Sequence, residues 1–127
     1  MPEAIQLLVA IQTSIIAVSH IVQPHAWVDF FVWLRGKGHA GVFANGFLSL
    51  WFGGLIVGFH PVWSGPALVI TLMGWAQLVK ATVAFTAPAL SMRGLERVSH
   101  ERSREFVIGG IGFLGISALS WYLVLVP

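Results

Sequence analysis

Four long apolar stretches, each bounded by a proline, limit what this chain can fold into more than any other feature. They cover residues 4–23, 40–60, 66–87 and 105–126. About 20 mostly apolar residues are enough to cross the hydrocarbon core of a bilayer as a helix. Pro24, Pro61 and Pro88 follow the first three stretches and Pro127 closes the fourth. Because proline lacks an N–H donor and interrupts helices, this spacing predicts four membrane-spanning helices.

The composition agrees with a membrane protein and excludes an ordinary soluble domain. The chain is 57% hydrophobic and 9% charged, whereas soluble domains are about 45–50% apolar and about 25% charged. Its 127 residues leave room for one domain, covering residues 1–127. The absence of cysteine excludes disulfides and thiol chemistry. We therefore predict an all-α, polytopic membrane protein whose four transmembrane helices form a bundle.

The first connection predicts a short amphipathic helix over residues 24–35. Its apolar residues recur at helical spacing on one face: Trp27, Phe30, Phe31 and Leu34. Pro24 suits the first turn of a helix, and Gly36 suits the position after the last. We expect this helix to lie in the membrane interface and to be anchored there by its aromatic face. The alternative is an aromatic-rich loop.

The basic residues outside the four stretches predict the orientation of the chain. Arg35 and Lys37 lie in the connection of residues 24–39, and four arginines lie in residues 88–104. The connection between them holds neither lysine nor arginine. Basic loops stay in the cytoplasm, so both termini should lie on the opposite side. The net charge of +2 belongs to these loops, and we expect no nucleic-acid partner.

A weak internal symmetry divides the chain. Helix, proline, basic connection, glycine-rich helix and proline occur in residues 1–61 and again in 64–127, although the residues themselves scarcely match. A duplication explains this order, and so does the shared topology of any four-span protein with basic inner loops. Two such halves would be related by an axis along the membrane normal.

Small and polar residues predict the faces through which the helices pack. In lipid, helices associate by close approach and interhelical hydrogen bonds. The candidate packing residues in the second and fourth stretches are Asn45, Ser49, Gly53, Gly54, Gly58, Gly109, Gly112 and Gly115. Because each glycine weakens a helix by about 1 kcal/mol relative to alanine, such clusters indicate close contacts. Two alternatives are open for these contacts: they form within one chain or between copies.

Three polar residues inside the apolar stretches form the candidate intramembrane site. Lys80 lies near the middle of the third stretch, Gln77 precedes it by one helical turn, and His20 lies at a comparable depth in the first. Ionisable residues inside a membrane are functional candidates. The alternative for Lys80 is that its long side chain reaches the inner headgroups. Gln6 and Thr13 continue a stripe with His20, which either ties helices together or coats a pathway.

Other residue types exclude several functions. The five carboxylates lie at the ends of the stretches or in the connections: Glu3, Asp29, Glu96, Glu101 and Glu105. No carboxylate is therefore placed to carry protons through the bilayer. No nucleophile with a base, and no pair of acids, is visible. We expect no enzyme, no catalytic residue and no cofactor.

The histidines do not predict a metal site. Those on the predicted cytoplasmic side are His20, His25, His39 and His100. Four histidines could gather a transition metal. The helical spacing of three or four residues, which such sites often use, is missing.

The segment "HPVWSGPALVITLMGWAQLVKATVAFTAP" resembles one that recurs in small bacterial four-helix integral inner-membrane proteins of uncharacterised activity. The residues that carry the resemblance include Thr71, Gly74, Trp75, Lys80 and Pro88. It implies a bacterial inner membrane and a four-helix fold. In that membrane the distribution of basic residues predicts periplasmic termini and cytoplasmic connections 24–39 and 88–104. The resemblance implies no activity.

Two functions follow as expectations. The first is a non-enzymatic accessory or structural subunit of a larger membrane complex, or a homo-oligomer, because the chain has little mass outside the bilayer and many glycines. Its partners would be the lipid bilayer and other membrane subunits or copies of itself. The alternative is a small channel or transporter for an anion or polar solute that uses Lys80.

Overall fold

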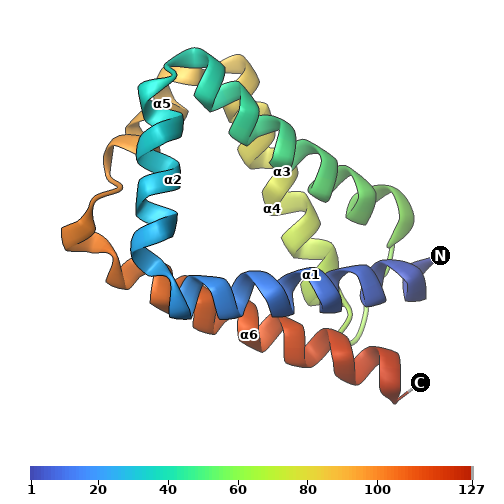
Figure 1. Ribbon diagram of the computed structural model, residues 1–127. Coiled ribbons are helices and arrows are strands. Elements are labelled where there is room, and N and C mark those ends of the chain that lie inside the picture. The colour runs from blue at the N-terminus through green and yellow to red at the C-terminus, as the bar shows by residue number, and fades with distance from the viewer. Residues whose placement is uncertain (127) are drawn as a thin grey trace.

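The computed structural model describes residues 1–126, and all regular secondary structure in them is helical, without a strand (Figure 1). The helices are α1 (Pro2–Val22), α2 (Pro24–Gly36), α3 (His39–Phe59), α4 (Leu68–Thr86), α5 (Pro88–Glu96), the 3-10 turn η1 (His100–Arg102) and α6 (Arg104–Leu125). The predicted all-α class is confirmed. Pro127, predicted to close the fourth stretch, lies outside the described residues.

Four of these helices are long and apolar enough to cross a membrane: α1, α3, α4, and α6 together with η1. The four predicted spans lie within two residues of the observed helices at every end. The helix predicted over residues 24–35 is α2. Helix α5 was not predicted. It starts at Pro88, as α2 starts at Pro24, within a segment that we treated only as a basic connection.

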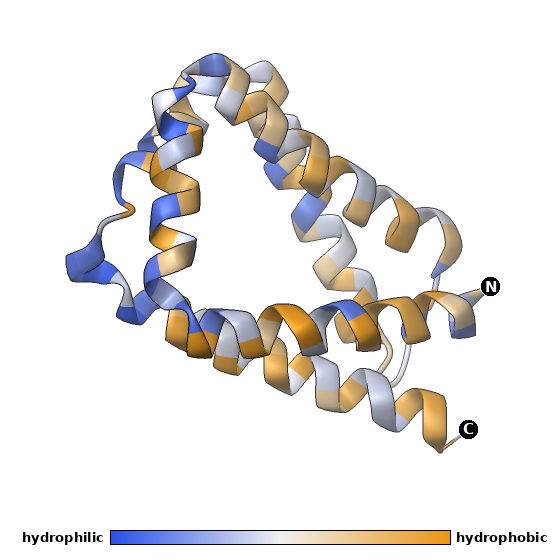
Figure 2. Cartoon of the chain, viewed as in Figure 1, coloured by the Kyte–Doolittle hydropathy of each residue, from blue (hydrophilic) through white to orange (hydrophobic). Residues whose placement is uncertain are grey.

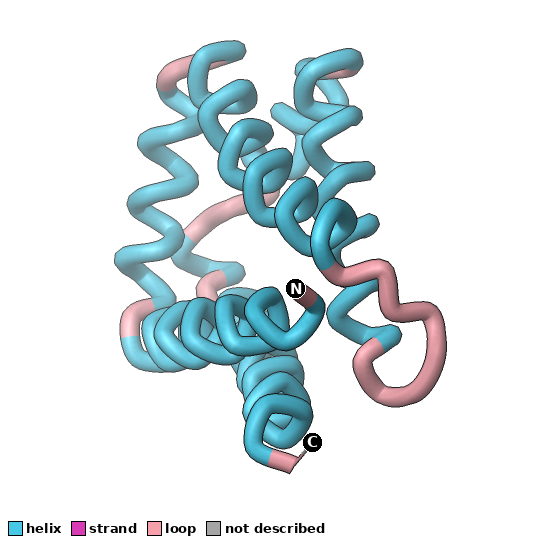
Figure 3. The backbone as a smooth tube through the Cα atoms, turned by 90° about the vertical axis from the view of Figure 1, so that its right-hand side faces the viewer, coloured by secondary structure: helices cyan, strands magenta, loops and turns pink. Residues whose placement is uncertain are grey.

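The long helices form two antiparallel pairs, α1 with α6 and α3 with α4 (Figure 1). The pairs meet near the termini and the loop between α3 and α4, which face the viewer in Figure 3. They diverge toward the opposite end, where α2 and α5 bridge the gap (Figure 1). The two pairs thus form a wedge. We call the end where they meet the narrow end and the end where they diverge the wide end.

Buried apolar and polar residues hold the narrow end together. Ile5, Val9, Ile56 and Ile70 form one apolar cluster there. His60 is completely buried beside it, and its Nδ1–H donates to Oγ1 of Thr71 at 2.9 Å. Nε2 of His60 accepts from the amide of Gln6 at 3.2 Å. These bonds need a neutral imidazole, and burial accordingly lowers the pKa of His60.

Polar contacts hold the wide end together. Hydrophilic residues gather in the segment between α5 and α6 and alternate with hydrophobic ones along α2, while the long helices are mostly apolar (Figure 2). The guanidinium of Arg35 donates to the carbonyl oxygens of Leu95 at 3.3 Å and Val98 at 3.2 Å. Leu95 lies in the last turn of α5 and Val98 just beyond its end, where a helix dipole favours a cation. Arg35 therefore ties α2 to α5.

A chain of three side chains adds a second link at the wide end. The Nδ1 atoms of His25 and His100 are 2.7 Å apart, and Nε2 of His100 lies 3.0 Å from the carboxylate of Asp29. This chain joins α2 to η1. Over residues 1–126 no group of three His, Cys, Asp or Glu side chains is arranged to hold a metal ion.

The two helix pairs are built in the same register, with equivalent positions 64 residues apart. A Cβ atom added at Gly46 would lie 2.9 Å from Cβ of Ala84, and one added at Gly110 would lie 2.9 Å from Cβ of His20. Positions 46 and 110, and likewise 20 and 84, differ by 64 residues. The contact of Gly46 with Ala84 joins α3 to α4, and the contact of Gly110 with His20 joins α6 to α1. Exchanging α1 with α4 and α3 with α6 therefore turns the first contact into the second.

Further contacts and prolines keep this register. Gly53 approaches the backbone nitrogen of Leu78, and the equivalent residues Ser117 and Ser14 are hydrogen-bonded through their hydroxyls. Pro2 and Pro66, and Pro24 and Pro88, are also 64 residues apart. The two halves are thus related by a pseudo-two-fold axis, and each helix pair contains one helix from each half.

Candidate intramembrane binding site

A cavity of about 560 Å³ lies between the two helix pairs, and we call it the central cavity. Both pairs and α2 contribute to its wall. Its polar lining includes Thr13, His20, Asn45, Ser49, Gln77 and Lys80. Aromatic residues supply much of the remainder, among them Trp27, Phe106 and Phe113. A small molecule would therefore meet apolar rings and a few polar groups, as in most ligand sites.

All three residues of the predicted site line this cavity: His20, Gln77 and Lys80. They come from both helix pairs, so the fold brings together residues up to 60 positions apart. His20 is almost completely buried, and its ring stacks on Trp27 with the centroids 4.2 Å apart. Its Nδ1–H donates to the carbonyl oxygen of Ile16 at 2.8 Å. A neutral His20 therefore keeps Nε2 as an acceptor.

Lys80 has no carboxylate partner in the part of the chain that the structure describes. The ion pairs there join Met1 to Glu3, Arg97 to Glu105 and His100 to Asp29. Lys80 is also the only lysine or arginine among the residues that line the central cavity. A charge in the middle of a span is costly unless it is compensated. Lys80 is therefore the feature of the cavity that most calls for an anionic group.

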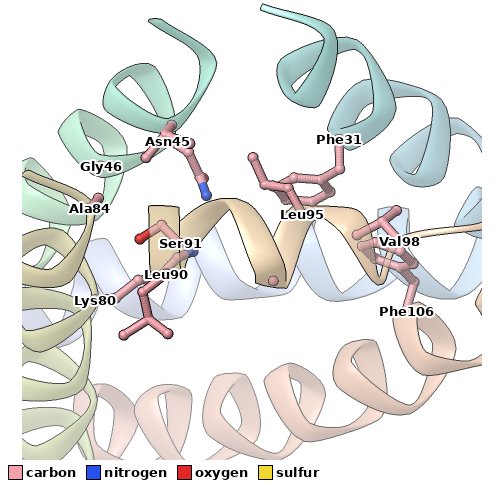
Figure 4. A pocket seen from close by; sticks show the side chains of 12 residues that line it. Phe31, Asn45, Gly46, Lys80, Ala84, Leu90, Ser91, Leu95, Val98 and Phe106 are labelled. Atoms are coloured by element: carbon pink, nitrogen blue, oxygen red, sulfur yellow. The ribbon is translucent and has the colours of Figure 1, made fainter. Parts of the chain in front are cut away.

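A second, smaller cavity of about 380 Å³ adjoins the first beneath α5. Lys80 and Asn45 line both cavities. In Figure 4 the Lys80 side chain extends from α4 toward α5, and Asn45 of α3 and Ser91 of α5 point into the same space. The smaller cavity is otherwise mostly apolar, with Leu95 on its wall. The amide and the ammonium thus stand where the two cavities meet.

The central cavity opens sideways at the middle of the spans. Leu48 and Trp51 lie on its rim, at the middle of α3, and are 62% and 70% exposed. Lys80, which lines the same cavity, is also exposed. If α3 crosses a bilayer, this opening faces the hydrocarbon core, so access does not require passage through water.

The central cavity lies on the pseudo-two-fold axis, because residues from equivalent positions line it from both sides. The pairs, each 64 residues apart, are Thr13 with Gln77, Ile16 with Lys80, and Ser49 with Phe113. The first pair is polar on both sides. In the other two pairs the polar member lies on α3 or α4 and the apolar member on α1 or α6. The two walls therefore differ in chemistry although they share a backbone arrangement.

The candidate packing residues fall into two groups. Asn45 and Ser49 line the central cavity, and Gly53 packs so closely on α4 that an added Cβ would lie 2.8 Å from the carbonyl oxygen of Gly74. The others would meet nothing within 4 Å: Gly54, Gly58, Gly109, Gly112 and Gly115. Within one chain these five pack against nothing, so their role in contacts between chains stays a prediction.

The candidate interfacial anchors face mostly into the fold. Trp27 stacks on His20, Phe31 stacks on Phe106 with the centroids 5.7 Å apart, and Leu34 is only 3% exposed. Among the four predicted anchors, Phe30 alone is classed as exposed. Their contact with a membrane interface stays a prediction. Trp27, Phe30 and Phe31 also line the central cavity, which was not predicted, because a helical face alone does not say what it covers.

Comparisons of the chain with protein-family models, with curated proteins and with solved structures found no match.

Proposed function

We propose that this protein is a small channel or transporter of the bacterial inner membrane that binds an anion or polar solute in the central cavity. One observation carries the proposal: Lys80 lines the cavity and has no carboxylate partner among residues 1–126. An unpaired cation inside a span favours an anionic ligand. Gln77 and Asn45 would donate hydrogen bonds to the same group.

The wide end of the wedge would face the cytoplasm and the termini the periplasm. Helix α2, which contains Arg35 and is followed by Lys37, and the arginine-containing segment from α5 to α6 lie at the wide end (Figure 1), and basic segments favour the cytoplasmic side. A solute in the central cavity would then be separated from the periplasm by the apolar cluster of Ile5 and its neighbours. Passage across the bilayer would require the two helix pairs to part there.

The proposal is tested by current measurements on proteoliposomes adsorbed to a supported membrane. Concentration jumps of sodium benzenesulfonate should give a current that saturates with concentration. Lys80→Met should reduce this current at least about tenfold, because the selecting charge is lost. Lys37→Met is the matched control, since Lys37 lies outside the cavity with its ammonium 5.4 Å from the Trp33 ring centroid. Equal currents from wild type, Lys80→Met and empty liposomes would refute transport.

A specific observation also favours the second function, an accessory subunit or homo-oligomer. Gly109, Gly112 and Gly115 lie on α6 with open space around them, and α6 is the least buried of the four long helices. Glycines facing open space lower helix propensity without any contact in this chain, whereas small residues let a second helix approach closely. Gly112→Leu should then abolish copurification with partner subunits or copies, while leaving the monomer folded. Unchanged copurification would refute this function.

A further inference from the structure

We infer that the ligand of the central cavity is an amphipathic monoanion, a single acidic group on an apolar body, which enters sideways from the bilayer. The inference rests on the proposed function and specifies its solute. It combines the number of charges in the cavity, the chemistry of its two walls and the position of its opening.

The charge is single and lies on one wall. Lys80 is the only lysine or arginine that lines the cavity, and its equivalent on the opposite wall, 64 residues away, is Ile16. A ligand with two separated acidic groups would find an ammonium for one of them and an isoleucine for the other. Because an unpaired charge in an apolar environment is costly, the cavity favours one acidic group.

Lys80 and Asn45 mark the place of that acidic group. They line both cavities and point into the same space (Figure 4). An ammonium supplies up to three donors and an amide two, which suits a carboxylate, phosphate or sulfonate oxygen. Gln77 lies one turn from Lys80 on the same wall. The acidic group would therefore sit at the junction of the two cavities.

The remainder of the central cavity suits an apolar body. The wall from α1 and α6 carries Gln12, Thr13 and His20, but the rest of it is apolar. Ile16, Phe106 and Phe113 lie there, and Phe113 stands where Ser49 stands on the other wall. A cavity of about 560 Å³ is of the size that holds small-molecule ligands. A small hydrated anion would leave these rings facing water, which is unfavourable. An apolar chain or ring system covers them.

The opening decides the route of entry. Leu48 and Trp51 form an exposed apolar rim at mid-span, where a membrane offers hydrocarbon and no water. An amphipathic molecule is already concentrated in that medium. It can come from two sources: a free single-chain acid dissolved in the leaflet, or a phospholipid that inserts its phosphate while its chains stay in the bilayer.

The test is a binding titration of the full chain in nanodiscs of phosphatidylcholine. Trp27 and Trp51 line the cavity, so tryptophan fluorescence reports its occupancy. Three probes separate charge from apolar body: hexadecanesulfonate carries both, methanesulfonate only the charge, and hexadecanol only the chain. Hexadecanesulfonate should bind saturably and at least about tenfold more tightly than either of the others. Lys80→Ile should remove this advantage, whereas Lys37→Ile should not.

A second variant tests whether a loss of binding comes from the site itself or from unfolding of the protein. Asn45→Ala keeps the charge and removes one amide donor, so it should weaken hexadecanesulfonate binding about threefold to tenfold without changing the helical circular dichroism. Discs containing phosphatidylglycerol distinguish the two sources. If this phospholipid competes with hexadecanesulfonate through Lys80, the ligand is a phospholipid phosphate; if it does not, the ligand is a free amphipathic acid.

The outcomes separate the inference from the proposed function. Binding of methanesulfonate as tight as that of hexadecanesulfonate, and dependent on Lys80, would overturn the inference and leave the anion site standing. Equal binding of hexadecanol and hexadecanesulfonate would overturn the inference because the charge would not matter. Absence of any Lys80-dependent binding in a folded protein would overturn both.

Discussion

The two helix pairs share one register and one close glycine contact, at Gly46 and Gly110, but they differ in chemistry at the next contact along each pair. There α3 and α4 meet through small residues, with Gly53 against the backbone of Gly74. The equivalent contact of α1 and α6 is hydrogen-bonded: Trp121 donates to the hydroxyl of Ser14 at 2.9 Å and Ser14 bonds Ser117. Close approach and interhelical hydrogen bonds are the two means by which helices associate in lipid. The comparison teaches that either one can support the same contact at equivalent positions.

The same two pairs differ again where they face the central cavity. The wall from α3 and α4 carries Lys80 and Ser49, and the equivalent positions on the other wall carry Ile16 and Phe113. A symmetric backbone thus presents an asymmetric surface. The specificity that we propose depends on this difference between the halves and not on the shared scaffold.

The largest expected effect comes from crowding the α3 and α4 contact. Gly53→Leu should destabilise the protein by about 3 kcal/mol, because its Cβ alone would come within 3 Å of Gly74 and Gln77. Gly54→Leu is the matched control: nothing lies within 4 Å of that position, so the change should cost less than about 0.5 kcal/mol. Thermal unfolding in detergent measures both. Equal melting temperatures for the two variants would mean that this contact does not hold the pair.

Exchanging the cavity charge between the halves sharpens the comparison of the two walls. In the double variant Ile16→Lys with Lys80→Ile, the ammonium moves to the equivalent position on the opposite wall. Hexadecanesulfonate binding should recover only in part, to about threefold to tenfold weaker than wild type, because Gly109 stands at the position equivalent to Asn45. Lys80→Ile alone should lose at least about tenfold. Titration by tryptophan fluorescence checks both values. A double variant as weak as the single one would show that the walls are not functionally equivalent.

Removing the hydroxyl between α1 and α6 probes the hydrogen-bonded pair. Ser14→Ala deletes the acceptor of Trp121 and the partner of Ser117, and it should cost about 1 kcal/mol, since interhelical hydrogen bonds in membranes contribute modestly. Chemical unfolding in mixed micelles measures the change. Leu78→Ala, at the equivalent position of the other pair, removes no hydrogen bond between side chains and serves as the comparison. A neutral Ser14→Ala would mean that shape alone holds this pair.

The smallest expected effect concerns pH at the narrow end. Burial lowers the pKa of His60 below its ordinary value of 6.5, so the folded state favours the neutral imidazole. The stability that this provides is fully present above about pH 6.5 and is lost as the pH falls toward the lowered pKa. The melting temperature should therefore drop between pH 7.5 and pH 5. His60→Gln, which cannot titrate, should flatten this dependence; an unchanged slope would assign it to other groups.

The spans were predictable and their pairing was not. Length, apolar content and the prolines placed α1, α3, α4 and α6 within two residues, because a bilayer-spanning helix depends on local sequence. Helix α5 was not predicted because the sequence that follows it is rich in charged residues and because its end is held by Arg35 from α2, a contact between distant parts of the chain. Gly54 and Gly58 fit the small-residue pattern, yet the glycines in close contact include Gly46 and Gly110. A pattern of small residues does not indicate which face meets a neighbour.

The three polar residues of the candidate site could be predicted from the sequence. His20, Gln77 and Lys80 stood out because polar residues are rare in apolar spans, and all three line the central cavity. The aromatic wall could not be foreseen, since Phe106 and Phe113 look like any lipid-facing residues until α6 is placed beside α1. The register of 64 residues was equally hidden, because few residues match between the halves and only their contacts correspond.

The amino-acid sequence by itself determined that this protein is helical, how many apolar spans it has, and that a lysine lies within one of them. These properties follow from local chemistry, since backbone groups in lipid must be satisfied within each helix. The tertiary structure alone decided that the spans pair across the two halves, that the pairs diverge, and that Lys80 lines a cavity opposite Ile16. Those properties depend on contacts between residues far apart in the chain, whose small energies favour one packing only when summed over the whole fold.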